Sequence, residues 1–278
     1  MTLKVTYQGV PGAYSHIAAH EVFPDAEYLP CETFEIAMDK VQSGEADYAM
    51  IPVENSNAGR VSDVHFLLPQ MNLFIVGEHY LRVEHQLLGI KGAKLEDIQL
   101  ASSHPQALAQ CSVFLKKHHI QPEARIDTAK SCEDVCRWND KTKAAIASKL
   151  AAEIYHLDVL ASNIENAHNN TTRFLILSSQ HKLPSLSQER FVTSFIFKVK
   201  SIPAALYKAL GGFATNGINI NKIESYLLDG KFVSAQFYVE AEGHPESESF
   251  KNAFDELCFF SEQDSIKLLG TYRKENIA

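Results

Sequence analysis

With 278 residues and a formal net charge of −8, the chain is long enough for one large domain or two smaller ones. Its hydrophobic share of 45% and charged share of 22% are those of an ordinary soluble globular protein. The acidic balance, with no basic block, argues against non-specific nucleic-acid binding but does not exclude an anionic substrate, because a site can be locally positive.

Two further features bear on location and metal binding. No apolar run approaches the ~20 residues needed to span a bilayer, and the chain starts with a strand pattern rather than a leader, so we expect a cytoplasmic protein. Cys132 and Cys136 stand four residues apart, as do His16 and His20. The two side chains of each pair could be ligands of one metal ion. Because the sequence indicates no third ligand near either pair, we expect reduced thiols and no metal.

The first element is a strand over residues 3–8, followed by the turn Gly9-Val10-Pro11-Gly12-Ala13-Tyr14-Ser15 and a helix over residues 15–22. A glycine-rich turn after a first strand can bring backbone N–H groups and a helix N-terminus to an anion. The alternative is a tight turn between strand and helix, with Ser15 as the N-cap.

A polar cluster follows the next buried strand. Residues 47–53 form an apolar run of buried-strand type, and directly after it come Glu54-Asn55-Ser56-Asn57-Ala58-Gly59-Arg60. Ligands of open α/β sheets bind at such carboxyl ends of strands, whereas the alternative is a hydrophilic turn.

Strands and helices then alternate along the chain. Further strands are predicted over residues 26–29, 73–76, 81–90, 100–103, 124–126, 144–147 and 159–161. Helices are predicted over residues 33–43, 107–117, 132–138 and 149–155. This alternation up to residue 177 predicts a mostly parallel sheet flanked by helices, with residues 81–90 long enough to cross between two lobes.

Residues 104–106, His-Pro-Gln, open one of these helices and could carry chemistry. Pro105 suits the first turn of a helix, which leaves His104 and Gln106 near the helix N-terminus. His104 is a candidate proton carrier, and a helix-capping role is the alternative.

The stretch over residues 169–177, Asn-Asn-Thr-Thr-Arg-Phe-Leu-Ile-Leu, joins a polar run to an apolar strand pattern. Side chains alternate along a strand, so Thr172 and Phe174 would face one side and Arg173 and Leu175 the other. The guanidinium of an arginine can form two parallel hydrogen bonds with the carboxylate of a ligand. Arg173 could equally pair with a structural aspartate. We therefore predict a site at the mouth of this strand.

After a linker at residues 178–188, the order of the predicted strands and helices changes. Strands are predicted over residues 191–199, 218–228, 232–241 and 266–272, and helices over residues 203–215 and 246–259. Asp229-Gly230 is a strong hairpin signal between two of these strands. The βαββαβ order predicts a ferredoxin-like unit, whose sheet could pair across the subunits of a homodimer or homotetramer.

Five motifs stand in a fixed order along the chain. They are Gly9–Ser15, Ile51–Gly59, Ser103–Gln106, Asn170–Phe174 and Gly217–Ser225. In these motifs the chain resembles the prephenate dehydratases with a C-terminal ACT regulatory domain. The resemblance implies an α/β catalytic region over residues 1–180, with two lobes like those of type II periplasmic binding proteins, and an ACT domain over residues 190–275.

The resemblance also implies the reaction. Prephenate would lose its ring carboxylate and 4-hydroxyl together, giving phenylpyruvate for L-phenylalanine biosynthesis, and no cofactor is needed because aromatisation of the ring drives the step. Thr172 is expected to be the polarised donor to the leaving hydroxyl. The other catalytic residues that the resemblance places in the cleft are Glu54, Asn55 and Gln106. The residues expected to hold the substrate are Arg173, Phe174, Ser15, Ser56 and His104.

For the ACT domain, the resemblance implies feedback regulation by L-phenylalanine. The ligand-side positions would be Ala205, Leu206, Asn216, Gly217, Asn219, Ile220, Glu224 and Ser225. The chain departs from the family pattern in two places, with Ala204-Ala205-Leu206 for Gly-Ala-Leu and Glu224-Ser225-Tyr226-Leu227 for Glu-Ser-Arg-Pro. Ala204 adds a methyl group where glycine lets a ligand approach the backbone closely.

Two other functions stay open. Arogenate dehydratase differs only in its substrate, which carries an amino group in place of the side-chain keto group. A non-catalytic amino-acid-sensing protein, with the two lobes as sensor and the ACT unit as readout, belongs to a different class. The presence of Thr172 together with Glu54 and Gln106 argues for catalysis.

Overall fold

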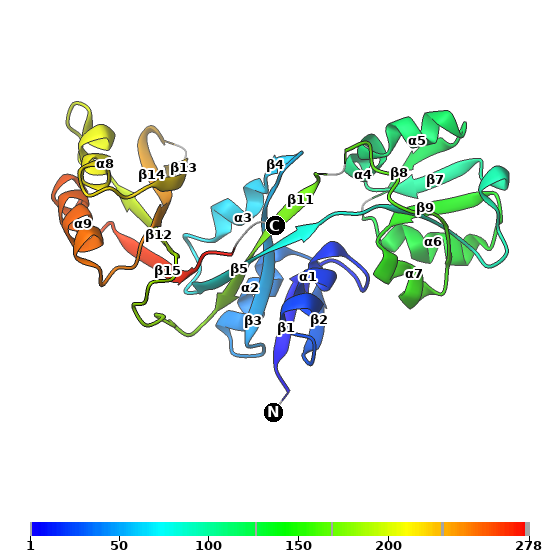
Figure 1. Ribbon diagram of the computed structural model, residues 1–278, viewed down its shortest axis with the longest axis horizontal. Helices are drawn as coiled ribbons and strands as arrows, with labels where there is room; N and C mark the ends of the chain where they lie inside the picture. Colours follow the sequence, from blue (N-terminus) through cyan, green and yellow to red (C-terminus); the bar gives the residue numbers. More distant parts are fainter. Residues whose placement is uncertain (1, 126, 168, 229–230, 276–278) are drawn as a thin grey trace. The chain divides into compact units, whose positions relative to one another are not determined.

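The structure, a computed structural model, describes residues 2–125, 127–167, 169–228 and 231–275 (Figure 1). One unit of the chain contains the residues up to Val64 and His79–Phe174, and the other contains His65–Glu78 and the residues from Leu175 onward. The domain boundaries 1–180 and 190–275 remain a prediction. None of the helices in the described ranges is long and apolar enough to cross a membrane.

The first sheet has the strand order β2-β1-β3-β11-β5, with β4 paired to β3. Its strands are β1 (Lys4–Gln8), β2 (Glu27–Cys31), β3 (Tyr48–Asn55), β4 (Gly59–Arg60), β5 (Phe74–Arg82) and β11 (Thr171–Ser178). β1 runs parallel to both β2 and β3. The boundary between the two units falls inside β5 and β11, so residues 171–174 of β11 belong to the first unit.

Helices cover both faces of this sheet at β1. The Thr6 hydroxyl donates to a carbonyl of α2 (Phe34–Gln42) at 2.9 Å. The ring of the next residue, Tyr7, stacks on His16 of α1 (Tyr14–Val22), with the ring centroids 5.0 Å apart. Because consecutive side chains of a strand point to opposite faces, the two helices lie on opposite sides of the sheet.

The alternative considered for this turn, with Ser15 as the N-cap of α1, is wrong in its capping residue. Ser15 is the second residue of the helix, and Ala13 takes the N-cap position without a side-chain hydrogen bond. Close packing shapes this turn instead, because Gly12 has φ +89° and a Cβ there would lie 2.8 Å from the Cα of Ala151 in α7 (Lys149–Tyr155). Glycine is the residue that adopts this conformation and also leaves room for α7.

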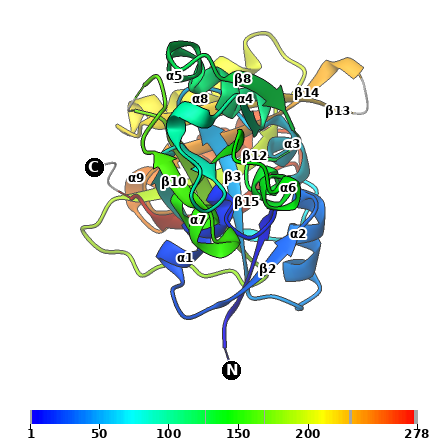
Figure 2. The ribbon, with the colours of Figure 1, turned by 90° about the vertical axis from the view of Figure 1, so that its right-hand side faces the viewer.

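The second sheet, with strand order β10-β6-β9-β7-β8, holds the middle of the chain. Its strands are β6 (Gln86–Gly89), β7 (Leu100–Ser103), β8 (Gln121–Ala124), β9 (Lys143–Ala147) and β10 (Asp158–Ala161), and the short 3₁₀ helix η1 (Leu95–Asp97) follows β6. One face is covered by α4 (Pro105–Gln110) and α5 (Ser112–Lys117), and the other by α6 (Lys130–Trp138) and α7, as Figure 1 and Figure 2 show.

The second sheet is mixed, although most of its strands run in one direction. β7 is parallel to β8 and β9, whereas β6 is antiparallel to both β9 and β10. The strands β7, β8, β9 and β10 therefore point the same way, as the alternation of strands and helices predicts. β6 runs against them because the chain enters it directly from the first sheet and not through a helical crossover.

The predicted single helix over residues 107–117 is two helices, α4 and α5, with a break at Cys111. The side chain of Asn166 fills the break. Its Nδ2 donates to the Ala109 carbonyl at 3.1 Å, and its Oδ1 accepts from Val113 N at 3.0 Å. These bonds satisfy backbone groups that a continuous helix would pair internally, and a local pattern cannot indicate them because Asn166 is distant in the sequence.

The predicted strand over residues 81–90 is also interrupted. β5 ends at Arg82, and β6 begins at Gln86. Between them, His85 N donates to Glu165 Oε2 at 3.0 Å and not to a neighbouring strand. A buried backbone N–H needs a hydrogen-bond partner, and here a side chain is that partner. The hydrogen bonding between strands is therefore interrupted where the chain passes from the first sheet to the second.

The C-terminal sheet of the second unit has the strand order β13-β14-β12-β15, with antiparallel pairing throughout. Its elements in chain order are β12 (Phe191–Lys198), α8 (Ala205–Thr215), β13 (Ile220–Leu228), β14 (Lys231–Glu242), α9 (Glu248–Phe260) and β15 (Lys267–Arg273). This is the predicted βαββαβ ferredoxin-like arrangement. The fold class of two α/β lobes followed by such a unit is confirmed, and the predicted hairpin residues Asp229-Gly230 lie outside the described residues.

The two faces of this sheet pack on different partners. Val239 of β14 belongs to a hydrophobic cluster with Phe213 of α8. The preceding residue, Tyr238, packs edge-on against His65, with the ring centroids 5.8 Å apart. Since neighbouring strand residues face opposite sides, the helices cover one face and the segment His65–Glu78 covers the other.

A short helix, α3 (Ser62–Leu67), is not among the predicted elements. The hydroxyl of Tyr226, one of the departures from the family pattern, lies 3.2 Å from Nδ1 of His65 in this helix. The two residues are 161 positions apart, so no sequence-local pattern indicates their contact.

Candidate active site

A cavity of about 330 Å³ lies in the first unit. Its wall comes from the ends of β1 and β3, the turns after β7 and β8, the helices α1 and α4, and the start of β11. Ligands of α/β proteins bind outside the carboxyl ends of parallel strands, so this cavity is the candidate active site.

The cavity brings most of the predicted site residues together. Those in its wall are Thr172, Asn55, Gln106, Phe174, Ser15 and His104. Those outside its described lining are Glu54, Arg173 and Ser56.

Thr172 is held by the side-chain amide of Asn55. Asn55 Oδ1 accepts from the backbone N–H of Asn57 at 3.0 Å and of Ala58 at 2.9 Å, so the amide nitrogen must point the other way. Asn55 Nδ2 donates to Thr172 Oγ1 at 2.9 Å and to Asn170 Oδ1 at 2.8 Å. Because Thr172 Oγ1 accepts this bond, the proton of its own hydroxyl is left to donate into the cavity.

The same direction of hydrogen bonding continues through Asn170. This residue is 1% exposed, and its Nδ2 donates to Gln110 Oε1 at 2.9 Å. His85 Nε2 lies 2.8 Å from the same oxygen. Since an amide oxygen only accepts, His85 carries a proton on Nε2, which leaves Nδ1 of the neutral ring as an acceptor facing the Tyr14 hydroxyl at 2.8 Å.

Burial keeps this network uncharged. It lowers the pKa of His85, so the ring stays neutral at neutral pH. It also raises the pKa of Tyr14 well above the usual value for a phenol, so the hydroxyl keeps its proton, which faces both His85 Nδ1 and the Glu84 carbonyl at 2.8 Å. The result is a network of neutral groups in which His85 and Asn170 both donate to Gln110 Oε1 and Asn55 donates to Asn170 and Thr172. A buried network of this kind rigidifies a site when all its members are paired.

Ser56 ties the two polar motifs together from outside the cavity. Its backbone N–H donates to the Thr171 carbonyl at 2.9 Å, and Thr171 N donates to Ser56 Oγ at 3.0 Å. The Ser56 hydroxyl itself donates to the Asn169 carbonyl at 2.9 Å. These bonds hold the end of β3 beside the start of β11, which places Asn55 next to Thr172.

Arg173 lies on the other side of β11 from Thr172 and Phe174, as the predicted alternation requires. It is 8% exposed, and its Nη1 lies 4.0 Å from Glu54 Oε2. Its guanidinium also lies over the ring of Tyr80, 5.9 Å from the centroid. The structure therefore pairs Arg173 with Glu54 and brings neither side chain to the cavity wall, because neighbours on a strand face opposite ways.

His104 and Gln106 occupy the amino-terminal end of α4. His104 is the N-cap, and its Nδ1 accepts from the backbone N–H of Gln106 at 3.3 Å. Both residues also line the cavity. The capping role considered for His104 is present, and a proton-carrying role stays a prediction.

Seven polar residues of the wall are not singled out as site residues by the sequence. They are Gln8, Tyr14, His85, Gln110, Asp127, Thr128 and Asn170. Asp127 and Asn170 stand at the ends of predicted strand and loop segments, which is the signal that could have found them. The contacts of His85 carry no such signal, since they join residues 25 and 71 positions apart in the sequence.

Metal-ligand side chains do not gather in the described ranges of the chain, where no group of three or more histidine, cysteine or acidic residues could hold an ion. His16 Nδ1 accepts from the backbone N–H of Gly12 at 3.1 Å. Cys132 is buried and Cys136 is exposed, and both are free thiols.

The predicted regulatory residues lie at the two ends of α8, in the turn after it and on β13. Ala205 and Leu206 begin the helix, Asn216 caps its end, Gly217 and Asn219 follow, and Ile220, Glu224 and Ser225 lie on β13. The residue before the helix, Ala204, has φ +56° and ψ +32°. This left-handed conformation favours glycine, the residue of the family pattern, and strains alanine.

A family model described as Prephenate dehydratase matches residues 5–182. A bifunctional N-acyl-homoserine lactone acylase/prephenate dehydratase of Komagataeibacter europaeus is 46% identical over 268 residues, which cover 96% of this chain and 95% of the relative. Arogenate dehydratase/prephenate dehydratase 1, a chloroplastic protein of Arabidopsis thaliana, is 39% identical over 284 residues, which cover 97% of this chain and 72% of the relative.

Among solved structures, the prephenate dehydratase of Arthrobacter aurescens in complex with L-Phe is similar over the whole fold. The TM-score is 0.88 at 28% sequence identity, and the match covers 98% of this chain and 90% of that one. The similarity therefore includes both the two-lobed region and the βαββαβ unit.

Proposed function

This chain belongs to the prephenate dehydratase family, and from that premise we propose that the cavity around Thr172 is its active site. The enzyme is a prephenate dehydratase, a lyase of aromatic amino acid biosynthesis. The observation that carries the site is the hydrogen bond from Asn55 Nδ2 to Thr172 Oγ1, because it leaves the threonine proton for the substrate.

The reaction requires a hydrogen-bond donor near the leaving oxygen and a substrate that is held in a fixed geometry. The bond from the ring to its carboxylate breaks to release carbon dioxide, its electron pair enters the ring, and the carbon–oxygen bond breaks as the ring becomes aromatic. The departing oxygen leaves as hydroxide unless it gains a proton. Thr172 is too weak an acid to act alone, so we assign it the role of donating a hydrogen bond to this oxygen while the Asn55 amide polarises it.

The wall around this donor is suited to an uncharged ring. Phe174 is 1% exposed and lines the cavity together with Pro52, Val61 and Val83. Apolar side chains exclude water, and a hydrogen bond is electrostatically stronger where water is excluded. Gln106 and Gln110 of α4 also line the cavity, and we assign Gln106 to orienting the substrate.

Incubation of the purified chain with prephenate tests the assignment. We expect phenylpyruvate and carbon dioxide in equal amounts, at the same rate with and without a chelator, because the proposed chemistry uses no metal. The reaction is followed by chromatography of the keto acid, with heat-denatured protein as the control. A folded protein that leaves prephenate unchanged contradicts the proposal.

The relative from Komagataeibacter europaeus also carries an acylase in its name. Acyl transfer by a serine, threonine or cysteine usually relies on a neighbouring base. In the described part of the cavity wall, no such oxygen or sulfur lies within hydrogen-bond distance of a histidine nitrogen. Dehydration is therefore the reaction that we propose for this cavity.

We further propose that L-phenylalanine binds to the βαββαβ unit and inhibits the enzyme. The Arthrobacter relative, which is similar over the whole chain, was solved with L-Phe. Titrating phenylalanine while following prephenate turnover and the molecular mass in solution tests both this regulation and the proposed homodimer or homotetramer. An unchanged rate of prephenate turnover at millimolar phenylalanine would contradict the regulatory proposal.

The variant Ala204→Gly sharpens this test. Glycine relieves the strain of the left-handed conformation, so we expect stabilisation by roughly 0.5–1 kcal/mol, seen as a rise of a few degrees in Tm. It also removes the methyl group beside the predicted ligand, so inhibition should require less phenylalanine than in the unmodified chain. An unchanged Tm would show that the strain is absent in solution.

A further inference from the structure

A second cavity, of about 550 Å³, adjoins the cavity around Thr172. His104 and Asp127 line both cavities, so the two adjoin at the turns that follow β7 and β8. The wall of the second cavity also contains Arg125 and Lys130, whereas the described wall of the first contains neither lysine nor arginine. The first cavity therefore has its nearest lysine and arginine in the wall of its neighbour.

A substrate in the first cavity needs a cation from outside the described wall. Prephenate is a dianion at neutral pH, because both of its carboxyl groups are ionised. The one fixed charge in the described wall is the carboxylate of Asp127, which repels an anion. Burial lowers the pKa of His85 in the same wall, so this ring does not supply a positive charge at neutral pH.

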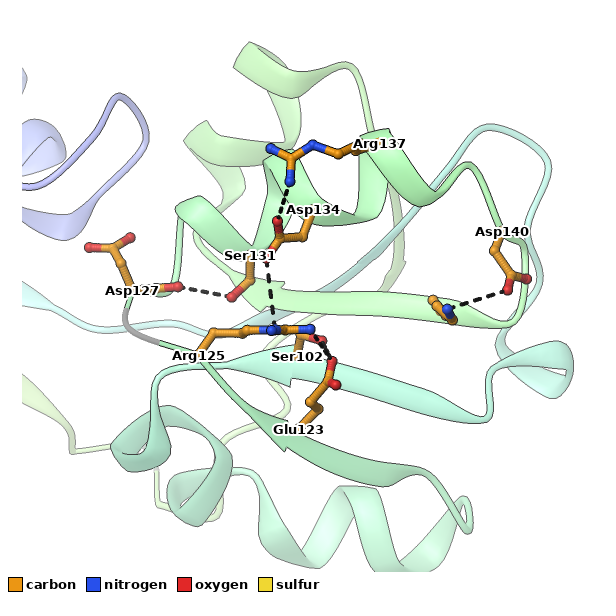
Figure 3. A network of polar contacts seen from close by, with 9 residues as sticks. Ser102, Glu123, Arg125, Asp127, Ser131, Asp134, Arg137 and Asp140 are labelled. Carbon is orange, nitrogen blue, oxygen red and sulfur yellow. Dashed lines mark hydrogen bonds and ion pairs between the residues drawn. The ribbon is translucent and has the colours of Figure 1, made fainter.

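Arg125 is already engaged by its own neighbours. Its Nη2 pairs with Glu123 Oε2 at 2.9 Å, and its Nε lies 3.8 Å from Asp134 Oδ2. Its guanidinium also lies over the ring of Trp138, 5.3 Å from the centroid. Figure 3 shows Arg125 between these two carboxylates and the Asp127 carboxylate turned away from them. Arg125 therefore balances charges of the protein itself.

Lys130 is the other cation of the second cavity. It is the first residue of α6, and its backbone N–H donates to Asp127 Oδ1 at 3.0 Å. Its side chain is exposed, and its ammonium group makes no ion pair within the described ranges of the chain. The bond to Asp127 fixes the backbone from which the side chain starts, and the flexible four-carbon stem lets the ammonium group move to an anion in the cavity.

The chemistry decides which carboxylate of prephenate a cation should bind. The ring carboxylate loses its charge as it leaves as carbon dioxide. A cation beside it would stabilise the substrate more than the transition state and would slow the step. The carboxylate of the pyruvyl side chain keeps its charge and remains in phenylpyruvate, so a cation beside this group strengthens binding without opposing the reaction.

We propose that Lys130 binds the side-chain carboxylate of prephenate, which extends from the cavity around Thr172 into the second cavity. The inference rests on the proposed function, namely that the first cavity is the dehydratase site. The ring then occupies the first cavity beside Thr172 and Phe174. Lys130 is a substrate-binding residue and takes no part in bond breaking, because the charge of its partner is the same in substrate and product.

The variant Lys130→Gln tests the proposal, because glutamine removes the charge and keeps the backbone N–H that donates to Asp127. We expect KM for prephenate to rise about tenfold, because a charge-assisted hydrogen bond to the substrate is lost. We expect kcat to stay within about twofold, because an interaction that is equal in the substrate and the transition state does not change it. The Kd of phenylpyruvate, measured by calorimetry, should rise by a similar factor to KM.

Lys149→Gln is the matched control. Lys149 is the first residue of α7, as Lys130 is of α6, and it is also exposed. It lies outside the described linings of both cavities, so KM for prephenate and the Kd of phenylpyruvate should not change. A second variant of the site, Lys130→Arg, keeps the positive charge and should retain most of the affinity that Lys130→Gln loses.

The outcomes separate the inference from the proposed function. Constants that rise together in Lys130→Gln, and not in Lys149→Gln, support the inference. An unchanged Kd of phenylpyruvate in a folded Lys130→Gln variant overturns it, as does an equal increase in both variants. A large fall in kcat also overturns it, because Lys130 would then act on the bond-breaking step. In these cases the proposed function stands, provided that the unmodified enzyme turns over prephenate. A folded unmodified protein that leaves prephenate unchanged overturns the assigned function of the cavity and the inference with it.

Discussion

Replacing Thr172 with alanine is expected to lower kcat for prephenate by about 10²–10⁴-fold, the range that a positioned proton donor contributes. KM should stay within a few-fold, because the hydroxyl acts on the leaving oxygen and not on the groups that anchor the substrate. The physical reason is the direction of the bond from Asn55, which leaves Thr172 as a donor toward the cavity. Alanine removes the donor without a large change in volume.

The variant Thr172→Ser separates the hydroxyl from the rest of the side chain. Serine keeps the oxygen that accepts from Asn55 and the proton that faces the substrate, so it should retain far more activity than alanine. Steady-state kinetics on prephenate, with circular dichroism to confirm folding, measures the difference. A folded Thr172→Ala variant with near-normal kcat would show that another group assists the leaving hydroxyl.

Replacing Asn55 with aspartate is expected to lower kcat by about 10²–10³-fold, the usual cost of removing one preorganised donor. A carboxylate still accepts from the backbone N–H groups of Asn57 and Ala58, so the turn keeps its partners. It cannot donate to Thr172 Oγ1 or Asn170 Oδ1, where Asn55 Nδ2 now stands at 2.9 and 2.8 Å. The hydroxyl of Thr172 would then turn to donate to the carboxylate and away from the substrate.

The neighbouring variant Asn57→Asp is the matched control. It adds the same negative charge at an exposed residue of the turn that lies outside the cavity lining, and it leaves the partners of Thr172 in place. Its kcat should stay within a few-fold of the unmodified enzyme. Equal losses of kcat in the two variants would mean that charge near the site, and not the lost donor, slows the reaction.

The sequence predicts the elements of the fold where one pattern dominates a segment. The strands β7, β9 and β10 and the helices α6 and α7 follow from alternating apolar and amphipathic runs, and these strands run in one direction as predicted. The strand predicted over residues 124–126 lies instead at β8, Gln121–Ala124. The βαββαβ order of the second unit is predicted in the same way. Such patterns predict these elements because a strand or helix with one buried face places apolar residues at a regular spacing. That spacing can be read from the segment alone.

The sequence fails where a distant side chain replaces a local hydrogen bond. Asn166 divides a predicted helix into α4 and α5, and Glu165 takes the backbone N–H of His85 and interrupts a predicted strand. Both residues belong to one loop that contributes no regular element of its own. Helix and strand propensity cannot anticipate such partners, because the competing bond exists only in the folded chain.

For the active site, the sequence by itself determines which side chains of β11 can share a face. The alternation of the strand separates Thr172 and Phe174 from Arg173, and the structure follows that separation. Only the tertiary structure decides that Asn55 meets Thr172 across 117 positions and that Gln110 meets Asn170 across 60. The facing of a side chain is set by its own backbone, whereas the direction of a hydrogen bond is set by the partners that folding brings to it.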